Sequence, residues 1–146
     1  MEKISVPRVI GAGIIFAAIG QIVHNLGSIM TMDFYLDPAY FPVWSKLMMP
    51  TAGPPPVTFF YYSIAFGIIN GILLALVYAV IRNGVPGVRT KRGVTYGFLV
   101  FLVAGLPGAL SLYLLVNLPS ALIAYWAFEN LIIYLIGGAV FGRLIF

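Results

Sequence analysis

The chain has 146 residues, of which 62% are hydrophobic and 8% are charged, with eight basic residues, four acidic residues and no cysteine. A soluble domain carries about 25% charged residues, so this composition is typical of a chain embedded in a membrane. The lack of cysteine excludes disulfides, thiolate metal sites and redox dithiols within the chain.

Four apolar runs reach the roughly 20 residues that a membrane-spanning helix needs. They cover residues 9–30, 57–81, 94–115 and 121–141. Each run should form a helix, because lipid cannot satisfy free backbone groups, and little chain remains for a soluble domain. We therefore predict a single all-α domain over residues 1–146, a polytopic membrane protein built as an antiparallel four-helix transmembrane bundle.

The basic residues predict the orientation of this bundle. Numbered from the N-terminus, one side holds seven of the eight: Lys3, Arg8, Arg82, Arg89, Lys91, Arg92 and Arg143. The other side holds Lys46 with Asp33 and Asp37. Both termini are therefore predicted to be cytoplasmic in a multi-pass protein of the cell (plasma) membrane. The basic connection, residues 82–93, can attract anionic lipid headgroups and is too short to suggest nucleic-acid binding.

Small residues recur on the predicted helices at helical spacing. In the first span Gly13, Ala17, Gly20, His24 and Gly27 share one face. The second span has the pair Gly67 and Gly71, and the fourth has Gly138 and Gly142. Such residues let a neighbouring backbone approach closely, either within the chain or on a partner membrane protein.

The first outer loop, residues 31–56, is rich in aromatic and apolar side chains, among them Tyr40, Phe41, Trp44 and Met48. This composition favours the headgroup region, so we expect an interfacial or re-entrant loop with a short helix over residues 42–49. Its role is to anchor the loop at the membrane surface, to cover an outward cavity, or to dock a partner.

The third span contains Pro107 between Gly105 and Gly108. Proline removes a helical hydrogen bond and clashes with the preceding turn, so a kink is expected near residues 103–107. Such a kink shapes helix packing or lines a site.

Glu129 is the only acidic residue inside any predicted span. Counted at about 1.5 Å per residue, Glu129 and Asn130 in the fourth span and Asn70 in the second fall near the membrane midplane. Gln21 and His24 in the first span lie slightly further out. A charge at this depth is costly, so these side chains should turn inward and meet.

Two explanations of this polar layer compete. In the first, amides and imidazole form a structural network with Glu129 that fixes the register of the helices. In the second, Glu129 and His24 exchange a proton at a site open to the outside. A third possibility is that Glu129 faces another subunit. A single histidine excludes a bis-histidine haem, and we predict no metal, no cofactor and no catalytic residue.

The second half of the chain carries a series of short motifs: residues 92–97 (RGVTYG), Leu106-Pro107, Tyr113, residues 118–122 (LPSAL), Trp126 and Gly137-Gly138. On these motifs, residues 62–146 resemble a group of small four-span bacterial and archaeal membrane proteins of unknown function. The resemblance implies four spans and brings no activity, substrate or site residue with it.

Three function hypotheses follow. The first is a non-enzymatic accessory or scaffold subunit that packs on partner membrane proteins, or on copies of itself, through glycine-rich faces and the aromatic loop. The second is a small proton-coupled carrier that uses Glu129 and His24. The third is a lipid- or quinone-modifying membrane enzyme, for which a lipid-sized cleft should reach the polar layer. Membrane lipids are expected partners in all three.

Overall fold

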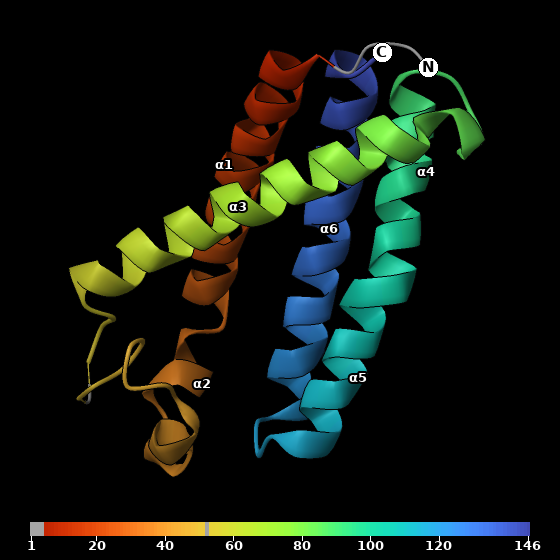
Figure 1. Cartoon of the computed structure of the whole chain (residues 1–146). Coiled ribbons are helices and arrows are strands. Elements are labelled where there is room, and N and C mark those ends of the chain that lie inside the picture. Colours follow the sequence, from red (N-terminus) through yellow and green to blue (C-terminus); the bar gives the residue numbers. More distant parts are fainter. Residues whose placement is uncertain (1–4, 52) are drawn as a thin grey trace.

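The computed structural model describes residues 5–51 and 53–146, so Lys3 lies outside the described residues. Within them the chain is helical and has no strand. Four helices are long and apolar enough to cross a membrane: α1 (Val6–Met30), α3 (Val57–Ile81, extended by the turn η2, Arg82–Gly84), the continuous helix α4–η3–α5 (Thr90–Leu115) and α6 (Ser120–Leu144). The predicted all-α four-helix architecture is confirmed (Figure 1).

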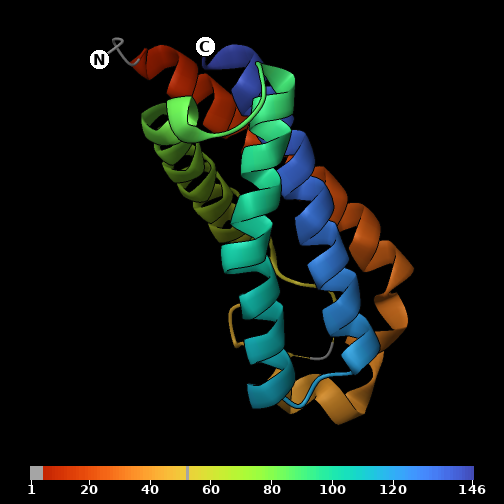
Figure 2. The ribbon, with the colours of Figure 1, turned by 90° about the vertical axis from the view of Figure 1, so that its right-hand side faces the viewer.

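The helices are arranged around α6, which packs against α1 on one side and against α4 on the other. α3 packs along α1 and crosses the bundle at a steep inclination, so its first turns extend away from the other helices (Figure 1). The start of α1, the end of α6 and the α3–α4 connection lie at one end, which we call the terminal end. Residues 31–56 and the α5–α6 turn lie at the other, the loop end (Figures 1 and 2).

Glycines set the closest helix contacts. A Cβ atom on Gly71 of α3 would overlap the carbonyl oxygen of Gly13 on α1, and one on Gly138 of α6 would overlap the carbonyl oxygen of Gly93 on α4. Neither neighbour can give way, because both are backbone atoms. The glycine pairs noted in the sequence therefore pack helices together within this chain.

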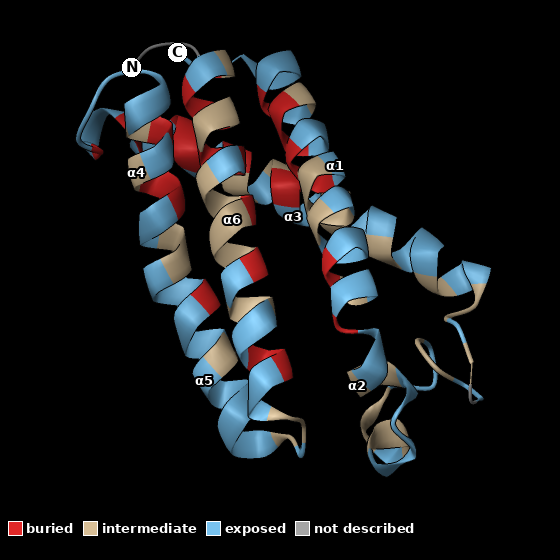
Figure 3. Ribbon diagram, turned by 180° about the vertical axis from the view of Figure 1, so that it is seen from behind, coloured by how far each residue is buried: buried red, intermediate tan, exposed pale blue. Residues whose placement is uncertain are grey.

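The aromatic core lies where the helices converge near the terminal end. The rings of Phe16 and Phe141 stack 5.6 Å apart, and those of Tyr78 and Tyr96 lie 5.2 Å apart. The Tyr96 hydroxyl donates to the Leu74 carbonyl oxygen at 2.8 Å, which ties the third span to α3. Figure 3 shows this buried region together with the largely exposed lower half of α5. The bundle is thus closed at the terminal end and loosely packed toward the loop end.

The third span is interrupted next to its proline. α4 (Thr90–Val100) is followed by a π-helical turn, η3 (Phe101–Gly105), and then by α5 (Leu106–Leu115) with Pro107 in its first turn. The wide turn lies directly before Pro107, which has no amide hydrogen to donate to the preceding turn, and Phe101 packs over Gly105. The interruption expected from the sequence is present, displaced a few residues toward the N-terminus.

The helix predicted over residues 42–49 is wrong. The loop instead contains α2 (Met32–Leu36) and the 3₁₀ helix η1 (Pro38–Val43). The Asp37 carboxylate accepts a hydrogen bond from the Ala39 amide at 2.9 Å, which starts η1 earlier than proline placement suggested. After Trp44, the Ser45 hydroxyl accepts from the Met48 amide at 3.1 Å and closes a turn. Phe41, Trp44 and Met48 therefore do not share one helical face.

Candidate functional site

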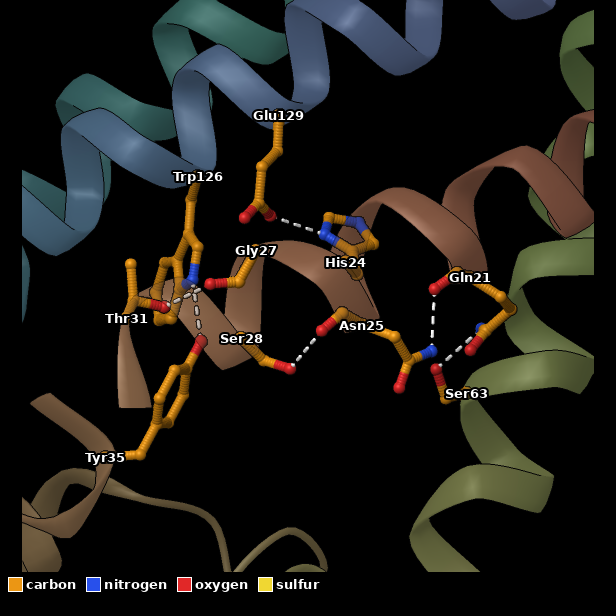
Figure 4. Close-up of polar contacts among 10 residues, drawn as sticks. All are labelled: Gln21, His24, Asn25, Gly27, Ser28, Thr31, Tyr35, Ser63, Trp126 and Glu129. Carbon is orange, nitrogen blue, oxygen red and sulfur yellow. Dashed lines mark hydrogen bonds and ion pairs between the residues drawn. The ribbon is translucent and has the colours of Figure 1, made fainter. Parts of the chain in front are cut away.

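The centre of the polar layer is a pair formed by α6 and α1. The Glu129 carboxylate and the His24 imidazole lie 2.8 Å apart between Oε2 and Nδ1 (Figure 4). The sequence predicted that Glu129 would turn into the bundle and reach His24, Asn70 or Gln21, and it reaches His24. The two side chains differ in exposure, 9% for Glu129 and 50% for His24. The carboxylate is thus buried, whereas half of the imidazole surface is open.

Gly27 makes room for this pair. It lies on α1 beside the Glu129 carboxylate, and a Cβ atom there would overlap Oε1. One turn further on, the buried Thr31 hydroxyl donates to the Gly27 carbonyl oxygen at 2.8 Å (Figure 4). The same carbonyl also accepts from the Thr31 amide at 3.0 Å, so Thr31 closes the last turn of α1 through both its backbone and its side chain. α1 and α6 can therefore approach closely at the depth of Glu129.

A second polar contact joins α1 to α3. The Gln21 side-chain amide donates to the Ser63 hydroxyl at 2.9 Å. On the same helix, the Asn25 side-chain amide donates to the Gln21 carbonyl oxygen at 2.6 Å (Figure 4). Gln21 therefore bridges two helices, as the structural explanation of the polar layer predicted, although it does not reach Glu129.

The predicted single network does not form. The side chains of Asn70 and Asn130 make no hydrogen bond to another described residue. The physical reason is the inclination of α3, which packs along α1 and carries Asn70 away from Glu129 on α6. Both amides instead line a cavity.

Two cavities adjoin in the loosely packed part of the bundle. The first, about 180 Å³, lies between α1, α3 and α6, and its polar lining consists of Gln21, His24, Ser63, Asn70, Asn130 and Tyr134. The second, about 300 Å³, lies between the η3–α5 segment and α6 and is lined mainly by apolar residues. Asn130 and Tyr134 line both cavities. A polar compartment and an apolar one thus share a wall on α6.

An aromatic cap covers the loop end of α6. We use this name for Tyr35, Trp44 and Trp126. The Trp126 indole donates to the Tyr35 hydroxyl at 2.9 Å (Figure 4), and the rings of Tyr35 and Trp44 stack 5.2 Å apart. Burial raises the pKa of the Tyr35 phenol above its usual 10.0, and the hydrogen bond from Trp126 partly offsets this. Trp126 precedes Glu129 by one helical turn, so the cap lies directly above the pair.

The sequence pattern predicted a role for Trp44 in the loop. It did not predict that Tyr35 and Trp126 join Trp44 in the aromatic cap. For Trp126, the spacing of three residues from Glu129 was a usable signal. For Tyr35 there was none, because its contact depends on how the loop folds back. Of the other predicted loop residues, Tyr40, Phe41 and Met48 are partly buried and make no ring contact with the cap.

The basic residues of the α3–α4 connection make their contacts at the terminal end. Arg82 is buried, and the Arg92 guanidinium donates to the Gly87 carbonyl oxygen at 3.0 Å. The guanidinium groups of Arg8 and Arg89 lie 4.4 Å and 5.9 Å from the centre of the Phe146 ring. Lys91 is exposed. These residues therefore lie far from the polar layer and tie α1, the connection and α6 together.

Among residues 5–51 and 53–146, no three His, Asp or Glu side chains are grouped closely enough to hold a metal ion. The chemistry that the pair can perform is proton transfer, because an imidazole and a carboxyl group in hydrogen-bond contact can share a proton. No family model, curated protein or solved structure matches this chain. The resemblance to small four-span membrane proteins stays a prediction.

Proposed function

We propose that this protein handles protons inside the membrane, as a small proton-coupled carrier, through Glu129 and His24. The observation that carries the proposal is the 2.8 Å contact between a buried carboxylate and a half-exposed imidazole that lines a cavity. A charged residue within a span that faces a partner and a cavity is a functional-site hypothesis by default.

The two nitrogen atoms of the imidazole give the route. A proton taken up at Nε2 of His24 can be matched by release of the proton on Nδ1 to Oε2 of Glu129, which leaves the imidazole neutral. The shared proton can rest on the imidazole or on the carboxylate. A solute in the cavity that changes this balance would be coupled to the proton.

The accessory-subunit hypothesis, which was motivated by glycine-rich faces and the aromatic loop, stays a prediction with part of its support reassigned. Its glycine-rich faces were to pack on partners, and Gly13, Gly71, Gly93 and Gly138 instead pack helices of this chain on one another. It keeps one supporting observation, since α5 has no buried residue and offers a whole apolar face to lipid or to a partner.

We also propose the orientation of the bundle. The described basic residues other than Lys46 belong to α1's first turns, the α3–α4 connection and its flanks, and the last turn of α6, all at the terminal end. This asymmetry supports a cytoplasmic terminal end in the plasma membrane.

Infrared difference spectroscopy of the full chain in lipid vesicles tests proton binding without a known solute. Stepping the pH should reveal a carboxyl band that disappears in Glu129→Gln, shifts in His24→Gln and persists in the matched control Asp33→Asn, since Asp33 is exposed in the loop. A spectrum that is the same in wild type and Glu129→Gln would contradict proton binding.

Transport is tested separately, by recording charge movement in the same vesicles with a panel of small amines and amino acids. We expect a current with at least one solute in wild type that Glu129→Gln abolishes. Equal currents in the two proteins across the panel would contradict the carrier.

A further inference from the structure

The two adjoining cavities contain polar groups that the protein itself leaves unsatisfied. Asn130, half-buried on α6, and Asn70, exposed on α3, line the first cavity and make no hydrogen bond to another described residue, and the same holds for the Tyr134 hydroxyl. An amide without a partner in a hydrocarbon environment costs several kcal/mol. Something with hydrogen-bonding atoms should therefore occupy the cavity.

We infer that the occupant is a membrane-soluble quinone, with its ring in the first cavity and its apolar tail in the second. The inference goes beyond proton handling and does not depend on it. It rests on the size of the first cavity, the placement of its amides, and the apolar lining of the second.

Size limits the head of the ligand. A cavity of about 150 Å³ accommodates a benzene ring. At about 180 Å³, the first cavity has room for a single substituted ring.

The amides fit a quinone because they belong to different helices that wall the same cavity. The carbonyl oxygens of a para-quinone lie at opposite ends of its ring, so the amides of Asn70 and Asn130 can each donate to one of them. The Tyr134 hydroxyl offers a third donor at the shared wall.

The second cavity suits an apolar tail. Its apolar lining includes Ala104, Gly105, Gly108, Ala109, Leu112 and Ile123. The small residues of this set come from η3 and α5, where the π-helical turn and Pro107 interrupt the third span. The tail would leave the ring past Asn130 and Tyr134 and run along α5.

Two glycines of α1 supply a matched pair of variants. A Cβ atom added to either Gly20 or Gly11 meets no atom within 4 Å, so both positions accept a side chain. Only Gly20 lines the first cavity. Gly20→Leu should fill the ring site, whereas Gly11→Leu makes the same chemical change on the same helix and leaves the site open.

The experiment is a fluorescence titration of the full chain in phosphatidylcholine nanodiscs, with Trp126 beside the second cavity as the reporter. A short-tailed ubiquinone analogue and the tail-free benzoquinone ring are added separately. Wild type and Gly11→Leu should show saturable quenching with both, and Gly20→Leu should lose the saturable part. Asn130→Leu should weaken binding about tenfold, the effect of one or two lost hydrogen bonds.

The tail is tested by Gly108→Leu, another open position, which should weaken the tailed analogue and leave the tail-free ring unaffected. A helical circular dichroism spectrum and a monodisperse elution profile show which variants fold. If a variant fails to fold, Asn70→Leu is tested in its place. Quenching that is linear in every protein, or saturable and equal in Gly20→Leu and Gly11→Leu, would overturn the inference and leave water or lipid in the cavity. Because no readout involves Glu129, this failure is distinct from failure of proton binding.

Discussion

The carboxylate of Glu129 occupies the space that a side chain on Gly27 would need. This relationship sets the distance between α1 and α6 at the depth of the polar layer. Gly27 lies about one helical turn after His24 on α1, so the same approach brings the carboxylate to 2.8 Å from the imidazole. The pair is therefore held by backbone packing as well as by its own attraction.

Gly27→Ala should separate the pair. The added methyl group overlaps Oε1, so α6 or the carboxylate must move, and overpacking of this kind costs about 1–3 kcal/mol. We expect a lower midpoint of thermal unfolding, measured by circular dichroism in mild detergent. Gly11→Ala is the control, because its Cβ meets no atom within 4 Å and alanine favours a helix. Equal midpoints for the two variants would contradict the packing described for Gly27.

Two substitutions of Glu129 should separate its structural role from its chemical one. Glu129→Gln retains a hydrogen-bonding group for His24 and should leave the thermal stability nearly unchanged. Glu129→Leu removes that group and should lower stability by about 1–3 kcal/mol, the range for a partner left unsatisfied. Thermal unfolding of the purified variants measures both. If Glu129→Leu is as stable as wild type, the pair contributes nothing to the fold.

The aromatic cap should open at alkaline pH. Burial raises the pKa of Tyr35 above 10.0, so the folded protein keeps the phenol neutral where a free phenol ionises. The stabilisation is fully present below pH 10 and is lost as the pH rises through the folded-state value. Acrylamide quenching of tryptophan fluorescence, followed from neutral pH upward, should therefore increase above pH 10. Tyr35→Phe should lack this step, and an identical step in that variant would exclude Tyr35 as its source.

The orientation of the bundle can be tested with reporter fusions. A reporter active only in the cytoplasm should be active when fused after Arg89 and inactive when fused after Lys46, because seven of the eight basic residues would then lie inside. A cytoplasmic signal from the fusion after Lys46 would reverse or break the predicted topology.

Much of the candidate site could be predicted from residue type and depth. Glu129 and His24 were selected because a charge within a span needs a partner, and Gln21 was placed in the same layer. The sequence could not show that Asn70 and Asn130 stay without partners, because this depends on the inclination of α3. The aromatic cap was equally inaccessible, since Tyr35 on α2 and Trp44 after η1 reach Trp126 only once the loop has folded back on α6.

The sequence by itself determined the four spans, the interruption before Pro107 and the pairing requirement of Glu129. These depend on local hydropathy, on the missing amide hydrogen of proline and on the cost of a charge in lipid, all of which act wherever the residue stands. Only the tertiary structure decided which groups meet. The close contact of Gly13 with Gly71 holds α3 on α1, and the first cavity lies between these two helices and α6. Helix crossing angles are set by packing between side chains that are distant in sequence, so they cannot be predicted from a local sequence pattern.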